Sequence, residues 1–413
     1  MGNPYRVPMD VIIDLQFGST GKGLLAGHLA QVHAPDTVVA AWGPNAGHTF
    51  MFNNMDKMVN IALPNGIVSE GLKRVMIGPG SVINPELLLS ELERYDAWMD
   101  GIDLCIHENA AVVLERHREA EAKYGFRIGS TMKGVGEAVI EKIRRYTYAP
   151  WEEPNGARLI NTAGEQFDLD HPLGKCVVNH REYIRKLAMA DRVLVEGAQG
   201  YSLGINSGMY PYVTSRECTV NQVLLDCGVP MGAGWEIKVH GVARTFPIRV
   251  ANRFGPCGCT TEPGAGGRPF NACVQCEGTG KIQIGTSGPC YPDQRELRWE
   301  DINQEPELTT VTRLPRRIFT FSEEQIRQAC LMSAVDDVFL NFCNYCPDEG
   351  AAVRRVIEKY APVRWLGFGP MVGNIKEAWH GQRARIAEEN RVDNPAPSRR
   401  AGHRRSPANH PYL

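Results

Sequence analysis

The stretch VIIDLQFGSTGKG, Val11 to Gly23, combines three features that together indicate a fold. Residues 11–15 form a short apolar run of the kind found in a buried strand. A glycine-rich turn, Gly18 to Gly23, comes next, and residues 24–32 follow it with a helical pattern. The order strand, turn, helix predicts an α/β nucleotide-binding unit, because backbone N–H groups and the helix N-terminus converge there on one anion.

The turn is a candidate phosphate site, made of Gly18, Ser19, Thr20, Gly21, Lys22 and Gly23. It is not a Walker A sequence, because only two residues separate Gly18 from Gly21 where that motif has four. Lys22 adds a positive charge beside the backbone N–H groups. The alternative is a turn that serves only as backbone.

Further along the chain the same pattern repeats. Apolar runs at 37–42, 75–77 and 192–195 each end in a glycine-containing turn, another run lies at 338–341, and a helical pattern covers 85–98. This alternation predicts an α/β fold with a mostly parallel central sheet, surrounding helices and ligands at its carboxyl edge. The turn after residues 37–42 contains Asn45-Ala46-Gly47-His48-Thr49, where His48 could donate a proton, although a lone histidine is more often structural.

Length and composition exclude several classes of protein. The chain has 413 residues, a net charge of -2 and 43% hydrophobic residues, values of an ordinary globular protein with a large core. It has neither a strongly basic balance nor an apolar run of about 20 residues, so we expect no nucleic-acid partner and no membrane span. Residues 1–8 lack the order of a signal peptide, which predicts a cytoplasmic protein. We assign residues 1–390 to a catalytic domain and the Pro- and Arg-rich residues 391–413 to a disordered basic tail.

The twelve cysteines divide into isolated and paired ones. Residues 254–284 are rich in Gly, Pro and Cys, have neither a helical nor a strand period, and are interpreted as an insertion. In a reducing cytosol the spacing of the cysteines in this insertion predicts a structural Zn²⁺ site more readily than disulfides. The alternative is that these cysteines are free. Cys343-x-x-Cys346 has no matching pair nearby and is interpreted as structural. The proposed zinc ligands are Cys257, Cys259, Cys273 and Cys276.

The two glycine-rich motifs, in their order and spacing, resemble adenylosuccinate synthetase. The resemblance spans residues 11–375 and is interrupted by the cysteine-rich segment. It implies a ligase that phosphorylates the 6-oxygen of a purine nucleotide and then replaces it with the amine of L-aspartate. The further motifs that carry it are Gly129–Gly136, Glu141–Arg145, Glu196–Gly200, Tyr210–Ser215, Arg244–Val250 and Gly369-Pro370.

The resemblance also implies a role for each matching residue. The turn would hold the donor phosphates with Gly47, Thr49, Gly369 and Pro370, and Mg²⁺ would bind at Ser19 and Gly47. His48 would protonate or stabilise the leaving oxygen, and Gln199 would orient the 6-oxygen. Arg145 matches an arginine that reaches the neighbouring subunit's site, which implies a homodimer. The other nucleotide-binding positions would be Asn45, Ser130, Thr131, Thr214 and Val250.

One departure from the family changes the expected substrate. Adenylosuccinate synthetases have an aspartate after the first glycine of the turn, which takes the N1 proton of inosinate; this chain has Ser19, too weak an acid for that work. An inactive enzyme is one interpretation. The other is that the shorter side chain leaves room for a 2-amino group, as on guanine. That pattern resembles the phage 2-aminoadenylosuccinate synthetases, the PurZ type, which act on dGMP; residues 285–294 and 316–322 look like that branch too.

A second departure concerns the phosphate donor. Residues 311–321 lack the aspartate with which the family reads the guanine of GTP, so ATP or dATP is the expected donor. Thr286, Ser287 and Gly288 are assigned to the aspartate-binding loop, with Arg295 as a candidate for its carboxylate-binding arginine. The sequence thus predicts formation of N6-succino-2-amino-2'-deoxyadenylate. The alternatives are an IMP-using adenylosuccinate synthetase and a non-catalytic nucleotide-binding or zinc interaction protein, which has no need of His48 or Gln199.

Overall fold

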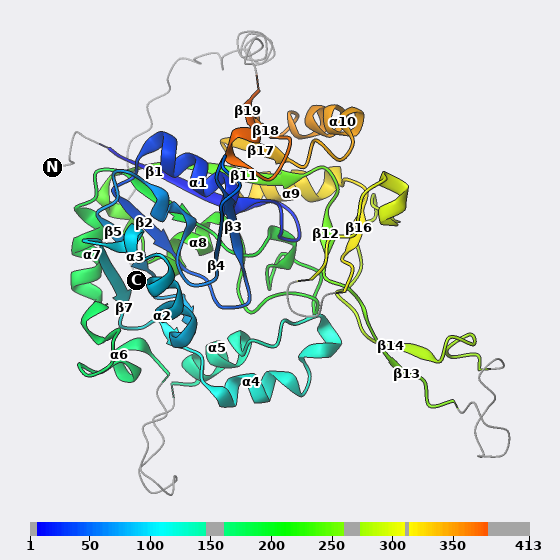
Figure 1. Cartoon of the computed structure of the whole chain (residues 1–413), viewed down its shortest axis with the longest axis horizontal. Helices are drawn as coiled ribbons and strands as arrows, with labels where there is room; N and C mark the ends of the chain where they lie inside the picture. Colours follow the sequence, from blue (N-terminus) through cyan, green and yellow to red (C-terminus); the bar gives the residue numbers. More distant parts are fainter. Residues whose placement is uncertain (1–5, 146–160, 260–272, 310–313, 379–413) are drawn as a thin grey trace, which may run out of the picture. The chain divides into compact units, whose positions relative to one another are not determined.

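A large, mostly parallel sheet organises the chain. The computed structural model describes residues 6–145, 161–259, 273–309 and 314–378, which belong to a compact unit that ends at Glu377, apart from Ala378. Ten strands form the sheet (Figure 1), and only the edge strand β19 runs antiparallel to its neighbour. In spatial order they are β19 (Ile375–Glu377), β18 (Val363–Gly367), β17 (Asp337–Asn341), β11 (Trp235–Arg244), β1 (Val7–Asp14), β10 (Val193–Glu196), β2 (Thr37–Ala40), β5 (Arg74–Ile77), β7 (Asp103–His107) and β9 (Val177–Val178).

The central strands are apolar because both faces of the sheet are covered. In β1, Val11 and Ile13 belong to one buried cluster and Ile12 to another, as the alternation of a strand requires. The first cluster includes side chains of α7 (His180–Ala188), α8 (Val220–Asp226), α9 (Glu323–Ser333) and α10 (Pro347–Ile357). The second includes α1 (Lys22–His33) and α2 (Pro85–Arg94). These two layers confirm the expected α/β fold.

Two sequence-based boundaries differ in the structure. The helix expected over 85–98 ends at Arg94, and a short α3 (Asp96–Met99) follows after Tyr95. Tyr95 is buried and its hydroxyl bonds with the backbone of Val59, so tertiary contacts fix the break. The remaining helices are α4 (Glu115–Ala122), α5 (Val135–Arg144) and α6 (Ala163–Gln166).

The cysteine-rich segment corrects a second expectation. It was interpreted as lacking any strand, yet β13 (Arg253–Pro256) and β14 (Lys281–Gly285) pair antiparallel. In Figure 1 this ribbon extends away from the large sheet. The other small sheets are β12 (Ile248–Arg249) with β16 (Arg317–Phe319) and β15 (Glu296–Leu297), β3 (His48–Met51) with β4 (Lys57–Asn60), and β6 (Val82–Ile83) with β8 (Ala111–Val112).

Helices of the described residues are all too short or too polar to cross a membrane. The tail assigned to residues 391–413 lies outside the described residues, so its predicted disorder stays a prediction.

Candidate active site

A buried carboxylate holds the glycine-rich turn in shape. Asp14 is the last residue of β1, and its Oδ1 accepts hydrogen bonds from the backbone N–H groups of Gln16 (2.9 Å) and Gly18 (3.2 Å). Its Oδ2 accepts from the Thr20 hydroxyl and from Lys22 Nζ (3.0 Å). Four donors therefore converge on one carboxylate that is 2% exposed. Asp14 was expected in a strand and had no predicted role; a charged residue inside an apolar run was the available signal.

Lys22 joins this turn to the turn after β10. Besides Asp14, its ammonium donates to the backbone carbonyl of Gln199 at 2.7 Å. Gln199 has a positive φ of 60°, a strained conformation for a non-glycine residue. The structure thus brings the predicted phosphate turn and Gln199 together at the carboxyl edge of adjacent strands.

The first N–H groups of α1 have no side-chain cap. Gly21 is the N-cap residue, with φ of 103°, and no side chain caps the helix. Asn341, at the end of β17, occupies the space where a Cβ of residue 21 would lie, and its Nδ2 donates to the Thr20 carbonyl at 3.1 Å. Glycine is therefore required at position 21 by both backbone and packing. An uncapped helix start of this kind suits a phosphate.

His48 begins β3 and is buried against Trp42. The two rings stack with centroids 4.3 Å apart and planes 15° from parallel. Burial, followed by the charge of Lys22, lowers the pKa of His48 to about 3. In this state the imidazole is neutral at physiological pH, so it can donate an N–H hydrogen bond but carries no spare proton. The hypothesis of a stabilising donor fits this environment better than that of an acid.

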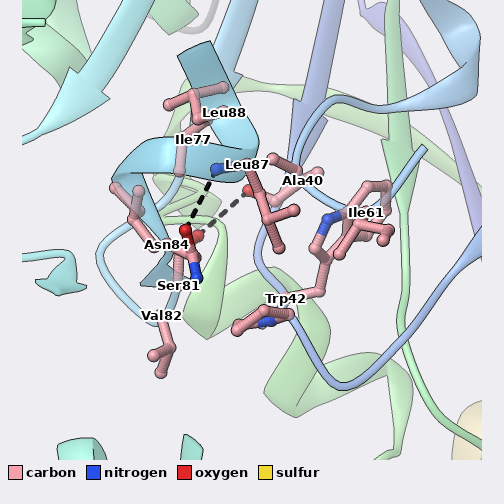
Figure 2. A pocket seen from close by; sticks show the side chains of 12 residues that line it. Ala40, Trp42, Ile61, Ile77, Ser81, Val82, Asn84, Leu87 and Leu88 are labelled. Atoms are coloured by element: carbon pink, nitrogen blue, oxygen red, sulfur yellow. Dashed lines mark hydrogen bonds between the residues drawn. The ribbon is translucent and has the colours of Figure 1, made fainter. Parts of the chain in front are cut away.

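A small apolar cavity is lined in part by Trp42. Figure 2 shows Trp42, Ile61, Ile77 and Leu88 among its lining side chains. Its volume is about 20 Å³, room for roughly one water molecule. It is far too small and apolar for a nucleotide, and we interpret it as packing space beside Trp42.

Ser19 is exposed at the tip of the turn. Its φ is 56°, and its backbone carbonyl accepts a hydrogen bond from Arg244 Nη1 at 3.1 Å. Arg244 is buried, pairs with Glu307 and lies with its guanidinium 3.8 Å from the centroid of the Phe342 ring. The serine side chain is thus presented at the site by a rigid backbone, with no carboxylate at this position.

A second group of predicted residues meets around Gly129. A Cβ added to Gly129 would lie 3.2 Å from both Ser287 Cα and Val250 Cγ2, so three separate motifs meet there. Ser130 bonds to Glu121 at 2.7 Å, and the Thr286 N–H donates to the Arg127 carbonyl at 3.1 Å. The predicted nucleotide and aspartate loops are therefore neighbours.

Two arginines that sequence analysis did not select surround the aspartate loop. Arg317 Nη1 donates to Ser287 Oγ (3.1 Å) and to the Gly288 carbonyl (2.6 Å), and Arg249 Nη1 donates to the Pro289 carbonyl (2.8 Å). Burial and then the charge of Arg317 lower the pKa of Arg249 to about 10. Arg295, the earlier candidate, is exposed, and its backbone pairs with Thr320. Arg317 therefore replaces it as the better-placed candidate.

The other predicted residues that the structure describes are at least partly open to solvent. Asn45, Thr131 and Thr214 are partly buried, Gly47 and Thr49 are exposed, and the Thr214 N–H donates to the Leu203 carbonyl at 2.7 Å. Gly369 and Pro370 follow β18 and pack near Asn374. Arg145 is exposed beyond the end of α5, and no contact of the described residues brings it to the turn. Residues 310–313, part of the region expected to meet the donor base, lie outside the described residues.

Comparison with known proteins agrees with these motifs. The adenylosuccinate synthetase family model matches residues 11–150 and 158–347. The N6-succino-2-amino-2'-deoxyadenylate synthase of Salmonella phage PMBT28 is 44% identical over 385 residues, which are 88% of this chain and 96% of that protein. The enzyme of the same name from Acinetobacter phage SH-Ab 15497 is 45% identical over 388 residues, 90% of this chain and 94% of that one.

A solved structure extends the match to three dimensions. It is the cyanophage S-2L succinoaminodeoxyadenylate synthetase (PurZ) bound to dGMP and to dATP as an energy donor. The TM-score is 0.76 at 40% identity, covering 93% of this chain and 98% of that one. These findings confirm the predicted fold, the predicted family and its phage branch. The chain belongs to the adenylosuccinate synthetase family of ligases, alongside the phage N6-succino-2-amino-2'-deoxyadenylate synthases.

Proposed function

We propose that this enzyme joins L-aspartate to dGMP and forms N6-succino-2-amino-2'-deoxyadenylate, a precursor of 2,6-diaminopurine nucleotides. The observation that carries the substrate choice is Ser19, an exposed small residue where the family has an aspartate facing the purine N1. A guanine base brings its 2-amino group next to N1, and a serine leaves room for it. The names of the phage relatives and the dGMP bound to the cyanophage enzyme support the same substrate.

The reaction runs in two steps. The purine O6 attacks the γ-phosphorus of the donor, the N1 proton of guanine passes to the transferred phosphate, and the nucleoside diphosphate leaves. The aspartate amine then attacks C6, inorganic phosphate departs with the oxygen, and the amine loses its proton. Lys22 and the uncapped first turn of α1 stabilise the negative charge on the transferred phosphoryl group. His48 donates its N–H to the departing oxygen, and Gln199 orients O6.

Magnesium fits the edge of the turn. Ser19 and Gly47 would hold the ion; both are exposed, and a Cβ at Gly47 would have nothing within 4 Å, so a hydrated ion has space beside that residue. Mg²⁺ is commonly held by few protein ligands, substrate phosphates and water. When bound, it neutralises charge on the donor phosphates. The carboxylate of Asp14 is unsuited to this task, because four donors already occupy its oxygens.

Aspartate would bind at the loop Thr286–Gly288. Arg317 and Arg249, which both bond to this part of the chain, place two positive charges beside the loop for the carboxylates of aspartate. Arg317 also pairs with Glu296, whose side chain is about half exposed. A substrate carboxylate that enters the site would replace Glu296 as the partner of Arg317.

A homodimer completes the site. Arg145 lies beside an apolar surface at the end of α5, where Ile140 and Ile143 are 39% and 67% exposed. A second subunit covering these side chains would receive Arg145 in its own nucleotide site. For the donor we favour ATP or dATP, since the related cyanophage enzyme has dATP bound as its energy donor.

A substrate panel tests the proposal. Purified enzyme with Mg²⁺ and aspartate is given ATP, dATP or GTP, and either dGMP or IMP, and mass spectrometry detects the succinyl product. We expect product from dGMP and not from IMP. Turnover of IMP alone would overturn the substrate choice, and nucleotide binding without any turnover would favour a nucleotide sensor.

Variants of Ser19 separate steric crowding from charge. Ser19→Asp and the neutral, equally large Ser19→Asn should both lower kcat/KM for dGMP by about 10- to 100-fold, because each fills the space of the 2-amino group. A lower kcat/KM for dGMP in Ser19→Asp alone would mean that the charge of the side chain, and not its size, excludes dGMP. Unchanged dGMP kinetics in both variants would contradict the steric account.

A further inference from the structure

Four thiols of the β13–β14 ribbon converge on one point. Cys257 and Cys259 follow β13, and Cys273 and Cys276 precede β14. All four Sγ atoms lie within 4.8 Å of one another, and the Cys257–Cys273 and Cys259–Cys276 pairs are 3.6 Å apart. A disulfide needs a separation of about 2.05 Å, so these pairs are not bonded.

The separations match a tetrahedral metal site. A Zn–S bond is about 2.3 Å, so four sulfurs around one zinc ion lie about 3.8 Å apart. An iron–sulfur cube spreads its four thiolates further, because each binds a different iron. N–H groups of Cys276 and Gln275 point at the Cys273 sulfur. Such bonds favour the thiolate form that binds metal.

Apolar packing in the described part of the ribbon is scarce apart from the cysteines. Phe254, Ile284 and Val274 are 59%, 42% and 78% exposed, and the buried cluster here consists of Cys257, Cys273 and Cys276, with Cys259 and Ile282 against it. A two-stranded ribbon without a core is marginal in water. A metal ion supplies the missing stabilisation in small elements of this kind.

The base of the ribbon leads directly into the active site. Gly285 ends β14 against the Phe126 carbonyl with no space for a side chain, and Thr286 of the aspartate loop follows. Thr286 Oγ1 donates to Asn252 Oδ1 at 2.9 Å, next to Arg253, which begins β13. Arg253 Nη2 donates to the Ser130 carbonyl at 3.3 Å, on the nucleotide loop. The pairing of the two strands therefore positions both substrate loops.

We propose that Cys257, Cys259, Cys273 and Cys276 bind one Zn²⁺ as a tetrathiolate, and that this ion fixes the strand pairing that positions the loop Thr286–Gly288. The zinc site stands independently of the enzyme's reaction. The effect of the zinc ion on aspartate binding rests on the function proposed above.

Metal analysis of the full-length protein tests the site. Elemental mass spectrometry should find about one zinc per chain, retained after dialysis against EDTA at neutral pH. Cys273→Ser with Cys276→Ser should lose the zinc, whereas Cys346→Ser, a partly buried thiol outside the cluster, should keep it. A wild-type protein without zinc, with zinc removed by brief dialysis, or with iron instead would overturn the site.

Hydrogen exchange tests the coupling without relying on activity. In the double variant the amides of residues 281–288 should exchange at least tenfold faster, while those of β1 and α1 stay protected, which shows that the protein is folded. With the reaction established, the KM for aspartate should rise about tenfold. Loss of zinc without faster exchange at residues 281–288 would overturn the coupling and leave the metal site standing.

Discussion

The environment of His48 predicts how it acts. Stacked on Trp42 and beside Lys22, with a pKa lowered to about 3, the ring is neutral throughout the range in which the enzyme is assayed. Its part in the reaction would be one N–H hydrogen bond to the leaving oxygen. Removing a single donor to developing negative charge costs ~10²- to 10³-fold in rate.

His48→Ala should therefore lower kcat by that factor and leave the Kd for dGMP within about threefold, measured by steady-state kinetics and calorimetry. His48→Gln, which keeps an N–H donor, should recover part of the loss. For the same reason kcat/KM should show no inflection from His48 between pH 5 and 8. Loss of dGMP binding in His48→Ala would mean instead that the residue is structural.

At the scale of elements, Asp14 ties the end of β1 to the first turn of α1. Asn at this position could accept fewer of the four hydrogen bonds and would place an N–H group against the Lys22 ammonium. Breaking a buried charge pair typically costs about 3–5 kcal/mol. Asp14→Asn should therefore lower the melting temperature and also reduce kcat at least tenfold, because Lys22 loses its position.

Asp36 offers the matched control for this prediction. It is also a buried carboxylate that accepts backbone N–H bonds, from Asp191 and Arg192, but it precedes β2 at the opposite edge of the sheet. Asp36→Asn should lower the melting temperature and leave kcat unchanged. Equal kcat in both variants would show that Asp14 serves stability alone.

The same elements show what a sequence can reveal. The strands β1, β2, β5, β10 and β17 were predictable because they are apolar runs buried on both faces, and the turns that follow them carry recognisable glycines. The strands β13 and β14 are short and largely exposed, and 24 residues separate them, so no local pattern marks them. The contacts of Asp14 and Arg317 depend on pairings between distant segments. Resemblance identified the site motifs, while the structure added the residues that hold them.

On the scale of the whole molecule, the two ends of the sheet's strands have different roles. The carboxyl edge carries the site, whereas a buried ionic cluster joins the central strands near their other end. His240 of β11 bonds to Asp337 of β17 (2.5 Å) and to Asp10 of β1 (2.9 Å). Lys238 and Arg364 approach Asp337, and His33 and Arg192 approach Asp10. This cluster holds three neighbouring strands in register.

The cluster predicts how stability depends on pH. Burial alone would lower the pKa of His240, but its hydrogen bonds to Asp10 and Asp337 outweigh burial and raise it. Burial would raise the pKa of Asp10 and of Asp337, but bonds to His240 and other partners lower both. The histidine's contribution is therefore complete below its unfolded pKa of about 6.5 and is lost as pH rises through the folded value. The aspartates' contribution is complete above about pH 4 and is lost as pH falls further.

His28, His48 and His107 have lowered pKa values, so they make the protein more stable as pH rises, opposite to the effect of His240. The test therefore compares variants with the wild type at each pH. The free energy of unfolding should be lower in His240→Gln than in the wild type at pH 6, and the difference should shrink steadily towards pH 9, as measured by urea denaturation. His171→Gln, a partly exposed histidine outside the cluster, should show no such trend. A difference for His240→Gln that stayed constant from pH 6 to 9 would mean that His240 stabilises the sheet by packing and neutral hydrogen bonds, without carrying a charge.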